Sequence, residues 1–81
     1  MIDTITSSII FDLKNEKQAK IFLESLELEA KNSPTDRVKV DIIQDNTKII
    51  TNFIAKDFVI LRAAMNSYLK WFKLINESIN L

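Results

Sequence analysis

The chain has 81 residues, 47% of them hydrophobic, and its 11 basic residues balance its 11 acidic residues to a formal net charge of zero. It contains no Gly, Cys or His and only one Pro. The missing glycines exclude phosphate-binding glycine loops and the glycine-containing motifs of common RNA-binding modules. The missing Cys and His exclude ordinary zinc sites, thiol nucleophiles and imidazole bases. We therefore expect no autonomous enzyme, no metal and no cofactor.

This length allows a single domain, residues 1–81, with a modest core. A domain of this size buries only about 60–65% of the surface that its unfolded chain exposes, so its stability alone is marginal. Because it can form neither disulfides nor a zinc site, association with a partner subunit is the remaining way to stabilise it. No apolar run approaches the ~20 residues that span a bilayer, and residues 1–4 lack the pattern of a signal peptide. We expect a cytoplasmic protein.

The first half of the chain predicts a strand followed by a helix. Residues 4–13 alternate between apolar and polar positions, which is the period of a half-buried strand. Asn15 then supplies an N-cap oxygen, and Gln18 stands three residues later, as in a capping box. Apolar residues recur from there at helical spacing; they are Ala19, Phe22, Leu23, Leu26 and Ala30. The pattern predicts one amphipathic helix that ends near Glu29 or Lys31.

The second half predicts a hairpin and a long helix. Residues 32–36, which contain the one Pro, predict a loop. Residues 37–44 and 47–55 alternate again, and Asp45-Asn46 between them can turn without Gly because Asn tolerates a positive φ. Asp57 is a natural N-cap for a helix that runs to about residue 79. The order strand, helix, strand, strand, helix predicts an α+β fold, a three-stranded antiparallel sheet with two helices on one face.

The second helix is apolar over more of its surface than one sheet can cover. Its polar residues form a narrow stripe: Arg62, Asn66, Lys70, Lys73 and Glu77. The non-polar arc spans roughly 240°, whereas a helix on one sheet needs little more than ~100°. The arc comprises a broad face, Phe58, Leu61, Ala64, Met65, Tyr68, Leu69, Phe72, Ile75 and Ile79, and a strip with small members, Ile60, Ala63, Ser67, Trp71 and Leu74. Either the first helix covers the surplus or part of it is an interaction site.

The predicted sheet also lacks a cleanly polar face. If Val38, Val40 and Ile42 face the helices, Ile43 points outward with Lys39 and Asp41. The last strand carries Ile49 and Phe53 on one face and Ile50 and Ile54 on the other, so neither of its faces is cleanly polar. A sheet of three strands has two open edges that need protection. Pairing of two copies, strand to strand or back to back, would supply it, so we expect a homodimer.

Residues 61–71, LRAAMNSYLKW, resemble the signature of the Pcc-type family, which includes the small dimerising subunit of the KEOPS (EKC) tRNA-modification complex and the CTAG-like proteins. Further positions agree in order and spacing: Ile9-Ile10-Phe11, Ala19, Leu26-Glu27, Ser33-Pro34 with Arg37, and Ala55-Lys56-Asp57. The resemblance covers nearly the whole chain. Two departures, Leu28 where the family often has Pro and Asp45-Asn46 where it often has Gly, concern the end of the first helix and the type of turn.

The resemblance implies a non-catalytic subunit of a complex whose catalytic subunit transfers threonylcarbamoyl to the tRNA adenosine beside the anticodon. It also implies that the subunit docks on this catalytic subunit through its helices and self-associates. Carried over by position, the docking residues are Arg62, Ala63, Asn66, Ser67 and Lys70, with Trp71 beside them as a typical interface anchor. The candidates for a contact with tRNA phosphates are Lys56 and Lys73.

Other interpretations of the same residues stay open. Arg62 and Asn66 suit an ordinary solvated helix face as well as a docking pair. Lys39 and Lys48 with the cations of the second helix would serve a free-standing RNA-binding module, although zero net charge disfavours one. The carboxylate pairs Asp41/Asp45 and Glu24/Glu27 lie on ordinary amphipathic elements rather than in a catalytic pattern. We assign four aromatic residues to the core: Phe22, Phe53, Phe58 and Phe72.

Overall fold

The computed structural model describes residues 3–32 and 37–79. Its elements are β1 (Ile5–Asp12), α1 (Glu16–Asn32), β2 (Val38–Asp45), β3 (Lys48–Ala55) and α2 (Phe58–Ile79). The order predicted from the sequence is confirmed, and α1 ends one residue beyond the later of its two predicted ends. Most of the predicted loop, residues 33–36, lies outside the described residues. Within the described chain, neither helix has the length and apolar character needed to cross a membrane.

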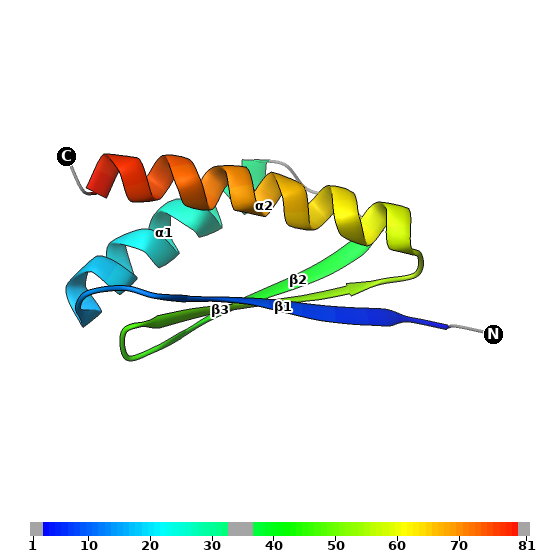
Figure 1. Ribbon diagram of the computed structural model, residues 1–81, viewed down its shortest axis with the longest axis horizontal. Coiled ribbons are helices and arrows are strands. Elements are labelled where there is room, and N and C mark those ends of the chain that lie inside the picture. Colours follow the sequence, from blue (N-terminus) through cyan, green and yellow to red (C-terminus); the bar gives the residue numbers. More distant parts are fainter. Residues whose placement is uncertain (1–2, 33–36, 80–81) are drawn as a thin grey trace.

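The sheet places β3 between the other two strands. β3 pairs antiparallel with β1 on one side and with β2 on the other, in the order β1-β3-β2 (Figure 1). Both helices cover the same face of the sheet (Figure 1). The predicted α+β fold is therefore confirmed, and β1 and β2 are its two edges.

Local signals in the sequence account for where the elements begin and turn. The Asn15 side-chain oxygen accepts a hydrogen bond from the Gln18 amide at 2.8 Å, and the Asp57 carboxylate accepts one from the Ile60 amide at 2.8 Å. Each bond satisfies an otherwise free amide of a first helical turn, so both predicted N-caps are confirmed. Between β2 and β3, Asn46 has a φ of 57°, the positive value expected of this glycine-free turn.

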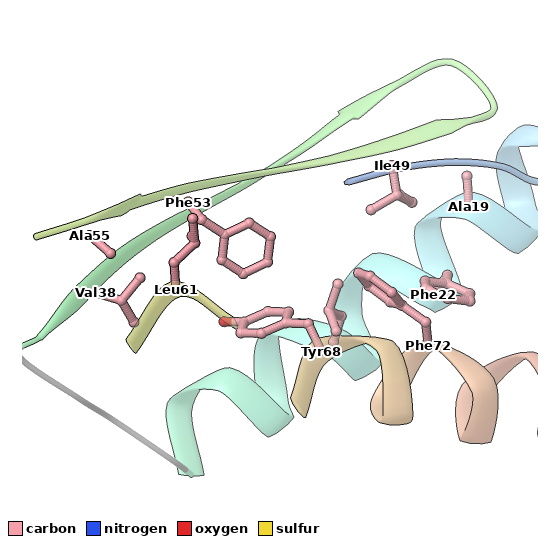
Figure 2. Packing of buried hydrophobic residues seen from close by; sticks show 10 residues of the cluster. Ala19, Phe22, Val38, Ile49, Phe53, Ala55, Leu61, Tyr68 and Phe72 are labelled. Atoms are coloured by element: carbon pink, nitrogen blue, oxygen red, sulfur yellow. The ribbon is translucent and has the colours of Figure 1, made fainter. Parts of the chain in front are cut away.

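The core lies between the sheet and the two helices. Its fully buried large side chains include Phe22 and Leu26 of α1, Ile49 and Phe53 of β3, and Phe72 of α2. The Phe22 and Phe72 ring centroids are 5.7 Å apart, and Phe53 meets Tyr68 edge-on at 5.1 Å (Figure 2). These contacts fix α2 against both the sheet and α1, which decides the sides of α2 that face outward.

One core assignment is wrong. Phe22, Phe53 and Phe72 are buried as predicted, but Phe58 is 65% exposed. The buried side of α2 is set by Leu61, Tyr68 and Phe72, and at 100° per residue Phe58 lies about 60° away from it. Leu69, also assigned to the apolar face, lies farther round in the same direction and is 45% exposed. Neither the sheet nor α1 covers this flank of α2.

Candidate partner-docking surface

A groove runs along the outer seam between the two helices. One wall is formed by α1 and Asn15 before it, whose side chains are polar apart from that of Ile21, and the other wall is formed by α2. The lining residues are Asn15, Lys17, Gln18, Ile21, Ser25, Glu29, Leu74, Ile75 and Ser78. Ile21 is 43% exposed and Leu74 is 61% exposed. Ser25 and Ser78 keep the space between these apolar side chains open. The seam therefore has the shape and the apolar character that a third helix would fill.

A second groove lies on the opposite flank of α2. It is lined by Phe58, Val59, Leu61, Arg62, Met65, Asn66 and Leu69, and is predominantly apolar. On a helical wheel of 100° per residue these positions centre about 180° from Leu74, Ile75 and Ser78. We call the first the seam groove and the second the flank groove. The surplus apolar arc of α2 is thus divided: α1 covers part of it, and each groove exposes a further part.

The docking residues predicted from the sequence form a band across α2 rather than one site. Arg62 and Asn66 line the flank groove. Ala63, Ser67 and Lys70 are exposed on the crest between the two grooves. Trp71 is half-buried on the side of α1, and its ring packs on Tyr68 with centroids 4.7 Å apart. Their role in docking stays a prediction, and the geometry assigns them to different surfaces.

The sequence pattern missed the contribution of α1. Ile21 lies outside the apolar stripe that defined this helix, yet it lines the seam groove. The signal for it was the spacing of Ile21 and Leu28, two exposed apolar residues seven positions apart and therefore on the same side of α1. Leu28, where the resembling family often has Pro, stands well inside the helix. The candidate docking surface consequently includes residues of both helices.

The cations considered for RNA contact do not form one patch. Lys56 and Lys73 are both exposed, but Lys73 is 15 residues into α2 and therefore roughly 20 Å along its axis from the turn that holds Lys56. On the outer face of the sheet Lys48 lies between Asp12 and Asp45 in the strand register. Alternating charge of this kind gives little net attraction for a phosphate backbone.

The carboxylate pairs likewise form no shared site. Asp41 and Asp45 are exposed on the outer face of the sheet, and Glu24 and Glu27 are exposed on α1. Among the described residues no group of three or more Asp, Glu, His or Cys is placed to hold a metal ion. Inside the core, burial raises the pKa of the Tyr68 hydroxyl above its ordinary value of 10.0.

Comparison with known proteins supplies the family. A family model described as "Transcription factor Pcc1" matches residues 6–80, from β1 to the end of the chain's last helix. The chain belongs to the Pcc1 family. A relative from Pyrococcus abyssi (strain GE5 / Orsay), named KEOPS complex subunit Pcc1, is 25% identical over 77 residues, which are 95% of this chain and 94% of the relative.

The Pcc1 fold is also found in a solved structure described as the binary complex Gon7-Pcc1. The matched chain has a TM-score of 0.75 and 21% sequence identity, over 99% of this chain and 96% of that chain. This likeness supports the fold over its whole length. The resemblance of residues 61–71 to the Pcc-type family is therefore confirmed by the family match.

Proposed function

We propose that this Pcc1 family member is a non-catalytic subunit of a cytoplasmic KEOPS complex. It docks on the catalytic subunit through the seam groove of α1 and α2, homodimerises, and so supports threonylcarbamoyl modification of the tRNA adenosine next to the anticodon. Family membership and the name of the Pyrococcus relative support the complex. The absence of Gly, Cys and His from the chain suits a subunit whose partner carries the chemistry.

The seam groove is the observation that carries the docking proposal. Two apolar side chains from different helices, Ile21 and Leu74, are exposed along it, and serines between them leave room for a helix. Packed helices have axes only 8–10 Å apart, a separation that small residues allow. Burying such apolar anchors in the centre of an interface supplies most of its binding energy. The expected occupant is an apolar helix edge of the catalytic subunit.

A matched pair of variants tests this docking. Ile21→Lys puts a charge into the seam groove, and Ile43→Lys changes an isoleucine of nearly equal exposure, 44%, on the outer face of β2. For Ile21→Lys we expect the dissociation constant with the catalytic subunit to rise about 30-fold, which is the loss of a hot spot of about 2 kcal/mol. Ile43→Lys should change it less than twofold, with both variants folded by circular dichroism. Equal affinities for the two variants would contradict the proposed docking site.

The salt dependence of binding separates this function from the alternative, a free-standing RNA-binding module. Contacts with several phosphates make affinity fall steeply as salt rises, because bound counterions are released. The affinity of an apolar helix contact changes little between about 50 and 200 mM salt. We therefore expect capture of the catalytic subunit to persist at high salt and any direct binding of tRNA to be lost. Tight binding of tRNA to the isolated subunit that falls steeply as salt rises, without capture of the catalytic subunit, would favour the alternative.

A further inference from the structure

The face of the sheet turned away from the helices carries a row of isoleucines. Both helices lie on one side of the sheet, and of the described elements none covers the other side, which we call the outer face (Figure 1). In the strand register Ile50 of β3 stands between Ile10 of β1 and Ile43 of β2. Ile10 is 60% exposed and Ile43 is 44% exposed. Cross-strand neighbours have Cβ atoms about 5 Å apart, so the three side chains form one continuous surface, the isoleucine row.

The isoleucine row departs from the composition that water favours on an uncovered sheet. An antiparallel sheet with one face in water carries mainly polar side chains on that face. Single exposed apolar residues are common on proteins, but these three lie side by side across all three strands. Farther along β3 on the same face, Ile54 is 43% exposed as well. A contiguous apolar surface of this kind marks an interaction site.

Carboxylates border the isoleucine row at both edges of the sheet. The pairs next to it on the hairpin side place Asp12 of β1 and Asp45 of β2 on either side of Lys48. The pairs on its other side include Asp41 of β2, and all three aspartates are exposed. The Thr47 hydroxyl donates a hydrogen bond of 2.7 Å to the Asp12 carboxylate and so holds it at its edge. With carboxylates in excess over the one ammonium group, the border of the isoleucine row is acidic.

This charge distinguishes the outer face from the two grooves along the helices. The seam groove is lined by Lys17 and Glu29, whose charges balance. The flank groove is lined by Arg62 and is therefore basic. An excess of carboxylates repels the phosphates of RNA and attracts Lys and Arg side chains. The isoleucine row and its border therefore fit a protein segment that combines apolar with basic residues, and they do not fit tRNA.

We propose that the outer face binds an amphipathic helix of a protein other than the catalytic subunit, with Lys or Arg on both sides of its apolar stripe. Along β3 the Cα atoms of Ile50 and Ile54 are about 13 Å apart, a distance that a helix spans in about nine residues. The flanks of a helix laid along β3 lie over β1 and β2. Its basic side chains meet Asp12 on one side, and Asp41 and Asp45 on the other. This inference goes beyond the proposed docking at the seam groove and does not depend on it.

A pair of synthetic peptides tests the chemistry of this surface. The lysine peptide is a helix of about 18 residues with leucines along one stripe and lysines on both sides of it. The glutamate peptide has Glu in place of each Lys. We expect the lysine peptide to bind the whole protein at least about tenfold more tightly. In nuclear magnetic resonance spectra of the labelled protein, the amide shifts should change in the three strands and not in α1 or α2.

Two isoleucine variants separate this proposal from the proposed function. Ile10→Thr changes the isoleucine row, and Ile21→Thr makes the same substitution in the seam groove. Ile10→Thr should weaken binding of the lysine peptide about tenfold and leave the affinity for the catalytic subunit unchanged, and Ile21→Thr should do the reverse. Asp41→Asn should also weaken binding of the lysine peptide and reduce its dependence on salt, because one carboxylate of the border is lost.

A photo-cross-linker placed at Ile10 of the whole protein in its native host identifies the occupant. We expect a cross-linked segment that is an apolar helix flanked by Lys or Arg, from a protein other than the catalytic subunit. Cross-linking to tRNA, to a second copy of this chain or to the catalytic subunit would overturn the proposal. Equal affinities of the two peptides, or of wild type and Ile10→Thr for the lysine peptide, would overturn it too. An unchanged affinity of Ile21→Thr for the catalytic subunit would count against the seam groove alone.

Discussion

Thr51 provides the sharpest test of the packing described above. It lies at the centre of β3, on the face toward the helices, and is fully buried. In the register it stands between Ile9 and Ile42, so both cross-strand neighbours are aliphatic. Within the described part of the chain its hydroxyl oxygen has no hydrogen-bond partner. A hydroxyl in this position has left water without regaining a hydrogen bond.

The expected effect of Thr51→Val follows from that loss. Burying a hydroxyl without a partner costs about 1–3 kcal/mol in protein mutational data, and Val has nearly the same shape with no polar atom. We expect Thr51→Val to raise the free energy of unfolding by about 1 kcal/mol. For a domain of 60–100 residues this corresponds to a rise in Tm of about 4–8 °C. A core substitution that stabilises is unusual, which makes the result informative.

The assay is equilibrium urea unfolding at one protein concentration, because self-association would otherwise shift the midpoint. Thr51→Ser is the matched variant: it keeps the hydroxyl and removes the methyl group, so it should destabilise by about 1 kcal/mol. The two variants should therefore move the midpoint in opposite directions with unchanged slopes. If Thr51→Val instead lowered the midpoint, the hydroxyl would have a partner, such as a buried water, and the reasoning would be refuted.

Four further outcomes are expected. Because burial raises the pKa of Tyr68, the unfolded chain loses its phenol proton at a lower pH than the folded chain, and the free energy of unfolding falls as the pH rises through about 10. Tyr68→Phe should lack this fall, which urea midpoints measured from about pH 8 to 11 would show. Asp57→Ala removes the cap on the Ile60 amide and should cost about 1 kcal/mol in the same assay, whereas Asp57→Asn should retain most of the stability. Asn46→Ala should destabilise by about 1 kcal/mol because of the positive φ, and Asn46→Gly should not; equal effects would mean that the turn changes conformation. Ser67→Trp, on the exposed crest of α2, should abolish capture of the catalytic subunit without lowering Tm, and an unchanged pull-down would contradict the docking role predicted for Ser67.

Local chemistry made most of the elements predictable from the sequence. Asn15 and Asp57 start the two helices because a short side chain with an acceptor oxygen can reach a first-turn amide. Asn46 closes the hairpin because its backbone tolerates a positive φ. Alternation and helical periodicity separate strands from helices because their side chains repeat every two and every 3.6 residues. Residues 61–71 carry the family signature within a single helix.

Burial, in contrast, was decided by the tertiary structure. Phe58 follows the apolar periodicity of α2 and is nevertheless exposed, whereas Ile21 departs from the stripe of α1 and lines the seam groove. A pattern tells in which direction a side chain points, and only the neighbouring elements determine what covers it. The hairpin fixes β2 beside β3, but pairing with β1 could have used either of the two. Because β1 joined β3 and not β2, the tertiary structure decided that β1 and β2 are the two edges of the sheet.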